Sequence, residues 1–277
     1  MHGARPPGHR PPAITRVAAL ALVLLAGMAS PAPAAAFNPD EALGASRAAV
    51  GREVANHHFF GLGGRTVSMH SLRGKPLIVS LVYTSCYGSC SIASLRLAQA
   101  VAVAREALGK DSFRVLTVGF DAPNDTPQRM AIFARQNRIK GDHWQVLSTD
   151  SGTAAALARD VGFTFETSPR GFDHVNQVTI LDADGRVYRQ IYGDDFKTPL
   201  LVEPLKELVW GTSRDGVSLE GWVNGLKLLC TVYDPSADRY KFDYSIFVGA
   251  IVGLLCLGAV GVFVVRSWSD GSNRPAV

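Results

Sequence analysis

Two cysteines, Cys86 and Cys90, stand four positions apart and directly follow an apolar run at residues 77–83. The length and β-branched content of this run predict a buried strand, so the thiols lie where a strand leads into a helix. If the helix begins near Cys86, the spacing puts both sulfur atoms on one helical face, and the helix N-terminus favours the first thiolate. Such a pair can bind one metal ion or close into a disulfide. The alternative is that both are simply small buried residues.

Strand and helix signals alternate around the cysteines. Helices are expected at residues 37–52, 91–108, 127–138, 154–160 and 198–210, and strands or hairpins at 56–70, 77–83, 113–120, 175–182 and 187–192. Asp125-Thr126-Pro127 offers a cap residue and a first-turn proline, and Gly185 belongs to a turn signal between the last two strands. This order predicts an α/β, thioredoxin-like domain with a central mixed sheet and flanking helices.

His174 is a third candidate ligand, just ahead of the strand expected at 175–182. A lone histidine in such a position is more often a surface or core residue than a ligand. In a thioredoxin-like domain, however, the loop that enters the closing hairpin lies against the start of the helix with the cysteines, so His174 can approach both sulfur atoms. Two thiolates and one imidazole suit copper, because sulfur prefers Cu(I) and the nitrogen lets the same site hold Cu(II).

The chain resembles the Sco/SenC family of copper-binding, thioredoxin-like proteins that assemble cytochrome c oxidase, over roughly residues 59–210. The motifs that carry the resemblance are Gly74-Lys75-Pro76, Val82-Tyr83-Thr84-Ser85-Cys86 with Cys90, Asp121-Ala122-Pro123-Asn124-Asp125-Thr126-Pro127, Asp173-His174 and Leu181-Asp182-Ala183-Asp184-Gly185. The resemblance implies that Cys86, Cys90 and His174 bind copper. It also implies that the protein delivers copper to the binuclear copper centre of the oxidase, or reduces the cysteines there.

The chain departs from the family pattern around these motifs. The family usually has a proline after each motif cysteine, where this chain has Tyr87 and Ser91. The residues common after the family's histidine are replaced by Val175-Asn176-Gln177. Members usually carry the membrane helix at the N-terminus. Because neighbouring groups tune a metal site, these changes bear on copper affinity, redox potential and choice of client protein.

The first 36 residues carry an export signal. They hold three arginines and no acid, a short apolar stretch at 17–28, and Ala34-Ala35-Ala36. This pattern predicts a secretory signal peptide cut before Phe37. An organelle transit peptide and an uncleaved anchor are the alternatives, but the apolar stretch is shorter than the roughly 20 residues that a membrane span needs.

A second apolar segment at residues 246–265 contains no charge and predicts a transmembrane helix, placed at 244–266. The expected organisation is a signal peptide (1–36), a thioredoxin-like copper-binding domain (37–210), a juxtamembrane segment (211–243), the membrane helix (244–266) and a cytoplasmic tail (267–277). The globular domain is then expected on the periplasmic or extracytoplasmic side of the inner (cell) membrane. Arg266 and Arg274 agree with a positively charged inner side.

Charge and cysteine content exclude two classes of protein. Removing the three leader arginines from 28 basic residues against 24 acids leaves a net charge of about +1. Nucleic acid is therefore not an expected partner, because phosphate binding needs a basic patch. Of the four cysteines, Cys256 lies in the membrane segment and Cys230 just before it, so the chain is not a disulfide scaffold. Cys230 is expected to be dispensable for metal binding.

Two functions of different classes remain open. The first is a non-enzymatic copper metallochaperone that serves cytochrome c oxidase or another cuproprotein. The second is a thiol-disulfide oxidoreductase that uses Cys86 and Cys90 to reduce client cysteines. Such reductases normally have two residues between their cysteines, so the third residue here, together with His174, favours metal. A peroxidase is less favoured, because the proline and threonine frame of such enzymes is replaced by Tyr83-Thr84-Ser85.

Other chemistry-bearing residues have simpler explanations. Asp121 and Asp125 could act as general acid and base, but a turn and a helix cap are favoured. The pairs His57-His58 and Met69-His70 could donate to copper, although strand-end surface positions are favoured. Trp144 and Trp210 are expected to pack in the core.

Overall fold

The computed structural model describes Gly3, residues 37–86, 88–141 and 143–211, Val223, Lys227 and residues 230–272. The chain divides into two units, Met1–Ala36 and Phe37–Val277. The predicted signal peptide therefore lies outside the described residues except for Gly3, as does the end of the predicted tail after residue 272.

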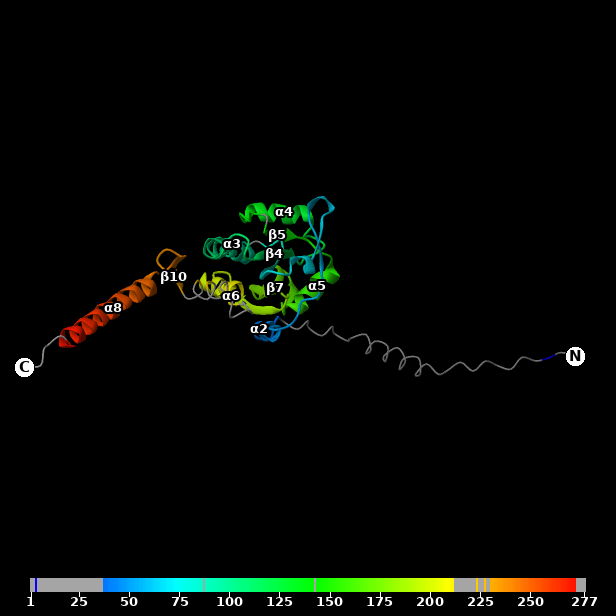
Figure 1. The fold of residues 1–277 in the computed structure, drawn as a ribbon. Coiled ribbons are helices and arrows are strands. Elements are labelled where there is room, and N and C mark those ends of the chain that lie inside the picture. Colours follow the sequence, from blue (N-terminus) through cyan, green and yellow to red (C-terminus); the bar gives the residue numbers. More distant parts are fainter. Residues whose placement is uncertain are drawn as a thin grey trace, which may run out of the picture. The chain divides into compact units, whose positions relative to one another are not determined.

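A five-stranded mixed sheet forms the centre of the described domain (Figure 1). Its strands are β3 (Leu77–Val82), β4 (Arg114–Gly119), β5 (Trp144–Leu147), β8 (Gln177–Leu181) and β9 (Val187–Tyr192), in the order β5-β4-β3-β8-β9. β3 pairs in parallel with β4 and antiparallel with β8, while β4 and β5 are parallel. Every residue of β3 is buried, as expected for a central strand covered on both faces.

Helices cover both faces of this sheet. They are α2 (Pro39–Ala48), α3 (Ser89–Leu108), α4 (Pro127–Gln136), α5 (Ser151–Asp160) and α6 (Pro199–Trp210). Alternate residues of β3 point to opposite faces, so Ile78 packs in a core with α3 and α6, whereas Val79 packs in a second core with α5. The expected α/β architecture with a central mixed sheet and flanking helices is confirmed.

Short antiparallel hairpins complete the described domain. They are β1 (His58–Phe60) with β2 (Thr66–Ser68), β6 (Phe165–Ser168) with β7 (Gly171–His174), and β10 (Thr231–Asp234) with β11 (Arg239–Phe242). Two 3-10 turns, η1 (Leu62–Gly64) and η2 (Met69–Leu72), flank β2. The sequence predicted the first hairpin but neither of the others, and it also missed β5. Trp144 of β5 is buried and its indole N–H donates to Thr117 Oγ1 at 3.0 Å, so its packing role is confirmed.

The hairpin of β10 and β11 packs against α3 and α6, a contact that the sequence had left open. The ammonium group of Lys206 on α6 donates to the Thr231 carbonyl at 2.7 Å and pairs with Glu203 at 3.1 Å. Glu203 also accepts a hydrogen bond of 2.8 Å from the hydroxyl of Tyr240. Cys230, at the start of the hairpin, is fully buried. The segment before the membrane helix therefore has a folded part that is fixed to the domain.

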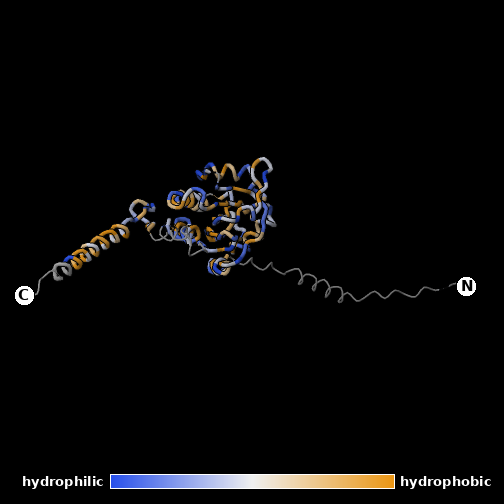
Figure 2. The backbone as a smooth tube through the Cα atoms, in the orientation of Figure 1, coloured by the Kyte–Doolittle hydropathy of each residue, from blue (hydrophilic) through white to orange (hydrophobic). Residues whose placement is uncertain are grey.

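The last described element is α8 (Ser245–Ser272), which is coloured mainly hydrophobic in Figure 2. Its part from Ser245 to Arg266 has 22 residues, a mean hydropathy of 2.7 and no buried side chains. At about 1.5 Å per residue it spans about 33 Å, enough to cross a hydrocarbon core of about 30 Å. Among the described residues it is the one helix with this length and composition, and it matches the predicted span.

Candidate metal and thiol site

The cysteine loop follows the carboxyl end of β3. The backbone N–H of Cys86 donates to the Tyr83 carbonyl at 3.3 Å, which forms a tight turn, and α3 begins only at Ser89 after Gly88. The helix therefore does not begin near Cys86, because the turn must be completed first. Cys90 lies in the first helical turn and Cys86 precedes it, so the two cysteines do not share one helical face.

The two thiols nevertheless meet. Cys86 and Cys90 are hydrogen-bonded to each other, and burial together with this hydrogen bond raises the pKa of the Cys90 thiol above its usual range. Cys90 thus keeps its proton at physiological pH. Cys90 is 4% exposed, whereas Cys86 is half-buried. Cys86 is therefore the sulfur that an incoming metal ion or client meets first.

Tyr83 lies between the elements of the site. Burial, followed by a hydrogen bond to Cys86, raises the pKa of Tyr83 to about 12, so the phenol stays protonated. The backbone of Phe172 acts in the opposite direction on the pKa of Tyr83, as the backbone of Tyr83 does on the pKa of Cys90. The sequence treated Tyr83 only as the end of a strand and missed this role, which no spacing pattern indicates.

His174 ends β7 and is enclosed by aromatic rings. Ring centroids lie 6.0 Å away for Tyr83, 5.9 Å for Phe120 and 5.3 Å for Phe163. Burial lowers the pKa of His174, so the ring is neutral at physiological pH. Its Nδ1 atom lies 3.2 Å from the carbonyl oxygen of Val175, which can only accept. Nδ1 therefore carries the proton and Nε2 keeps the lone pair that a metal ion would use.

The structure brings together two of the three predicted ligands. Cys86 and Cys90 are in contact, while His174 lies against Tyr83, which in turn contacts both cysteines. Within the described part of the chain, no three His, Cys, Asp or Glu side chains are grouped closely enough to hold a metal ion. In this arrangement the thiols form one pair, and His174 lies beside the ring of Tyr83.

A buried carboxylate holds the cysteine loop in place. Asp125 is fully buried, and its Oδ1 atom accepts hydrogen bonds of 2.7 Å from both the backbone N–H and the hydroxyl of Thr84. Its Oδ2 atom accepts a third, of 2.9 Å, from the backbone N–H of Asp121. Burial raises the pKa of Asp125. A Cβ atom at Gly119 would lie 2.4 Å from that of Asp125, so glycine is needed there to make room.

This arrangement corrects two sequence expectations. The expected turn is confirmed, because the N–H groups of Asn124 and Asp125 both donate to the Asp121 carbonyl. The cap before Pro127 is Thr126, whose hydroxyl accepts from the Arg129 N–H at 3.3 Å, so Asp125 does not itself cap α4. His57 was expected at the surface, yet it is buried with Nε2 2.7 Å from a carboxylate oxygen of Asp160. Both differences arise because a buried polar group needs a partner, and that partner lies elsewhere in the chain.

The remaining candidates lie apart from the thiols. His58 and His70 are exposed, as expected, whereas Met69 is buried in the core. Trp210 is also buried, which confirms its packing role. Cys256 is exposed on α8. The four cysteines, all among the described residues, form no disulfide.

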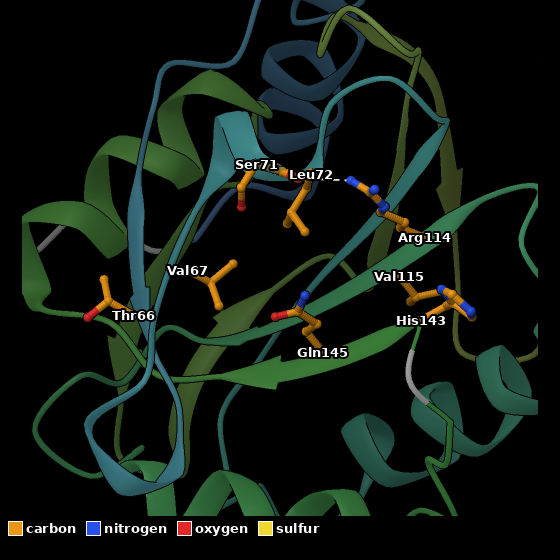
Figure 3. A pocket seen from close by; sticks show the side chains of 8 residues that line it. All are labelled: Thr66, Val67, Ser71, Leu72, Arg114, Val115, His143 and Gln145. Carbon is orange, nitrogen blue, oxygen red and sulfur yellow. Dashed lines mark hydrogen bonds between the residues drawn. The ribbon is translucent and has the colours of Figure 1, made fainter.

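A separate polar cavity of about 320 Å³ lies at the other end of the sheet (Figure 3). Arg114 and Gln145, near the starts of β4 and β5, line it together with Ser71. Because β3, β4 and β5 are parallel, this cavity is remote from the cysteines at the end of β3. Arg114 donates to the Ser71 carbonyl at 2.9 Å and holds the cavity wall together.

Comparisons with known proteins show one matching family and several structures with a similar fold. The sequence profile of the SCO1/SenC family matches residues 48–209. The chain is similar to the structure of a candidate electron transfer protein from Aquifex aeolicus VF5, with 27% identity, a TM-score of 0.53, and coverage of 60% of this chain and 96% of that one. For a SCO1/SenC family lipoprotein from Bacillus anthracis str. Ames the identity is 16%, the TM-score 0.52 and the coverage 57% and 95%.

A third similar structure is that of BsSco, described as a member of the Sco family of cytochrome c oxidase assembly proteins in which a disulfide switch was identified. It has 19% identity, a TM-score of 0.50, and coverage of 57% of this chain and 94% of that one. At such identities the likeness shows the fold, which confirms the expected thioredoxin-like architecture. No curated protein matches the chain significantly in sequence.

Proposed function

The chain belongs to the SCO1/SenC family, and on that premise we propose that it binds copper through Cys86, Cys90 and His174. Its role is that of a non-enzymatic metallochaperone that helps to mature the binuclear copper centre of cytochrome c oxidase. The observation that carries this proposal is the pair of hydrogen-bonded thiols at the carboxyl end of β3. The description of BsSco as an oxidase assembly protein supports the same role.

The donor set fits copper better than hard cations. Thiolate sulfur is a soft ligand that prefers Cu(I), and a neutral imidazole suits both Cu(I) and Cu(II), whereas magnesium and calcium prefer oxygen. The lone pair on Nε2 of His174 is available because Nδ1 is held by the Val175 carbonyl. The ring of His174 lies one aromatic side chain away from the thiols, so copper binding by all three groups draws His174 toward Cys86.

Metal analysis of the full chain in detergent tests the proposal. After reduction and anaerobic addition of copper, we expect about one copper ion per chain. The copper affinity should fall by about tenfold or more in Cys86→Ser, Cys90→Ser and His174→Ala. A thiolate-to-Cu(II) charge-transfer band in the visible region should disappear in either cysteine variant. Cys230→Ser is the matched control, because Cys230 is buried beside the β10–β11 hairpin, and it should bind like the parent. A parent with intact thiols that takes up no copper contradicts the proposal.

Thiol-disulfide exchange is the second candidate function, favoured by the contrast between a reachable Cys86 and a buried Cys90 in contact with it. The Cys86 thiolate would attack a client disulfide and release one client thiol. The Cys90 sulfur would then attack Cys86, release the second client thiol and leave a Cys86–Cys90 disulfide. Two electrons and two protons pass to the client in this sequence.

His174→Ala separates the two functions. If copper binding is the working chemistry, cells that carry this variant should assemble the oxidase poorly at low copper, although the dithiol still forms and breaks its disulfide. Normal assembly with His174→Ala, together with failure of Cys86→Ser, would assign the role to thiol exchange.

We also propose that α8 anchors the protein in the inner membrane, with residues 37–210 as the copper-binding domain on the periplasmic side. The length and hydropathy of Ser245–Arg266 support the anchor, and the leader pattern of residues 1–36 supports export. A reporter that is active only outside the membrane should be active when inserted near Gly211 and silent after Val277. The reverse pattern would invert the proposed orientation.

A further inference from the structure

A groove of about 420 Å³ lies between α4, η1 and the edge strand β5. α4 contacts both β5 and η1, and α4 and β5 are labelled in Figure 1. The apolar lining of the groove consists of Leu62, Pro127, Ala131, Ala134, Ile139, Trp144 and Val146. Leu62 is 55% exposed, so apolar surface continues from the groove to solvent. The volume falls within the roughly 300–1,000 Å³ typical of ligand pockets, so the groove has room for apolar side chains of a ligand.

The outer side of β5 carries peptide groups that point away from the sheet. β5 pairs with β4 only, and the N–H of Val115 on β4 donates to the His143 carbonyl at 2.9 Å. In a parallel pair, one residue turns both its N–H and its C=O toward the neighbouring strand, and the next residue turns both away. Because His143 faces β4, Trp144 and Val146 turn their peptide groups outward, and both residues line the groove.

This outer edge is closed at one end and open beside the groove. Ser148, just after β5, exchanges hydrogen bonds of 2.8 and 2.9 Å with Phe60, which confirms the alternation. The chain then turns away, since the N–H of Gly61 donates to the Arg65 carbonyl at 2.7 Å. Within the described residues, the N–H and C=O of Val146 have no hydrogen-bond partner. Open groups of this kind on an edge strand are a template for another strand.

Three cationic side chains surround the same groove. Arg65 stands beside η1, Arg135 is on α4 and Lys140 follows α4, and all three residues are exposed. No acidic residue is among the described residues that line the groove. In the described part of the chain, none of the three cations forms an ion pair. The groove therefore favours a ligand that carries negative charge.

We propose that this groove binds a short acidic segment of a partner protein in an extended conformation, which adds to the outer edge of β5. The segment exchanges backbone hydrogen bonds with Val146, places apolar side chains in the groove and sets its carboxylates beside the three cations. A lipid headgroup or an inorganic anion has no peptide groups for the strand edge. A second copy of this chain would bring the same cations together, which is unfavourable. No groove residue belongs to the thiol site, so this inference goes beyond the proposed function and does not depend on copper.

A labelled peptide tests the inference. Fluorescein-labelled Gly-Glu-Val-Glu-Val-Glu-Gly should bind the full chain in detergent, measured by fluorescence anisotropy, and should bind more weakly as salt is added. The analogue with glutamine in place of each glutamate should bind about tenfold more weakly or worse, because it lacks the charges. Absence of saturable binding by the acidic peptide overturns the inference.

Backbone methylation separates strand addition from simple charge attraction. Alternate residues of a strand turn their N–H groups to opposite sides. Two analogues, one methylated on the valine nitrogens and one on the glutamate nitrogens, should therefore differ, and the one that loses its donors to β5 should bind about threefold to tenfold more weakly. If neither analogue binds more weakly than the parent peptide, strand addition is wrong.

Substitutions locate the site. Arg135→Gln and Lys140→Gln should each weaken peptide binding by about twofold to fivefold, and both together with Arg65→Gln by about tenfold or more. Arg129→Gln is the matched control, because Arg129 is an exposed cation on α4 that does not line the groove, and it should bind like the parent. An equal loss in Arg129→Gln and Arg135→Gln would show that net charge attracts the peptide, and would contradict binding in the groove.

Hydrogen exchange gives the most direct readout. The outward N–H of Val146 should exchange rapidly in the parent alone and about tenfold or more slowly with saturating peptide, because the added strand accepts its hydrogen bond. Unchanged exchange at Val146 in the saturated complex overturns the inference. Displacement of the peptide by inorganic phosphate at constant ionic strength would mark a site for small anions and would overturn it as well.

Discussion

Replacing Asp125 tests whether one buried carboxylate organises the cysteine loop. Three donors converge on it, two from Thr84 and one from the backbone of Asp121. In Asp125→Asn the amide oxygen can still accept from Thr84, but the amide nitrogen then faces the Asp121 N–H, so two donors oppose each other. An unpaired buried donor costs about 1–3 kcal/mol, which is the expected loss in the free energy of unfolding. Asp125→Ala leaves no acceptor and should cost about 3–5 kcal/mol.

Urea unfolding of the full chain in detergent, followed by tryptophan fluorescence, measures these losses. Asp150→Asn is the matched control, because exposed Asp150 caps α5 by accepting hydrogen bonds from Thr153, and asparagine caps a helix equally well. It should change stability by less than about 0.5 kcal/mol. Because Thr84 lies two residues before Cys86, Asp125→Asn should also speed alkylation of buried Cys90 under native conditions. If Asp125→Asn is as stable as Asp150→Asn and Cys90 reacts no faster, the carboxylate does not organise the loop.

Two further predictions concern pH and the C-terminal hairpin. Burial raises the pKa of Asp125, so the stability that this group contributes is fully present below the ordinary carboxyl value near 4 and is lost as pH rises through the raised value. In urea titrations between pH 4 and 7, the difference in free energy of unfolding between the parent and Asp125→Asn should therefore shrink as pH rises. A difference that grows with pH would show that the three hydrogen-bond donors affect the pKa of Asp125 more than burial does. Lys206→Met should lower stability by about 1–2 kcal/mol and speed hydrogen exchange in β10 and β11, because Lys206 is buried between Thr231 and Glu203. Lys241→Met, which removes an exposed ion pair of 3.0 Å with Asp234, should cost at most about 1 kcal/mol, and equal effects of the two changes would argue against the buried contact.

The sequence predicted the features that depend on neighbouring residues. β3, α3 and α4 lie within a few residues of their expected positions, because apolar periodicity, Pro127 and Gly109 act locally. The meeting of Cys86 and Cys90 was also predictable, since both flank one strand-to-helix junction. A single helical face for both sulfur atoms was not, because Cys86 belongs to the turn closed on Tyr83, ahead of the start of α3 at Ser89.

The sequence could not predict contacts between distant segments. Asp125 and Thr84 are 41 positions apart, and His57 and Asp160 are 103 apart, so no local pattern links them. The strands β6 and β7 have four residues each and alternate weakly, which explains why the hairpin with His174 was missed. The aromatic rings around that histidine come from separate elements and meet only in the folded domain. Grouping of His174 with both cysteines stays a prediction.

The short connection between the hairpin and α8 limits where the domain can travel. Only Asp243 and Tyr244 separate Phe242 of β11 from Ser245 of α8, and two residues extend at most about 7 Å. With α8 as the anchor, the linker is too short to let the domain move away from the membrane surface. A globule of about 200 residues is about 40 Å across, so a metal acceptor standing farther than that from the bilayer is out of range. The domain then meets its clients by lateral diffusion in the plane of the membrane. Only clients whose metal acceptor lies within this distance of the bilayer can be served.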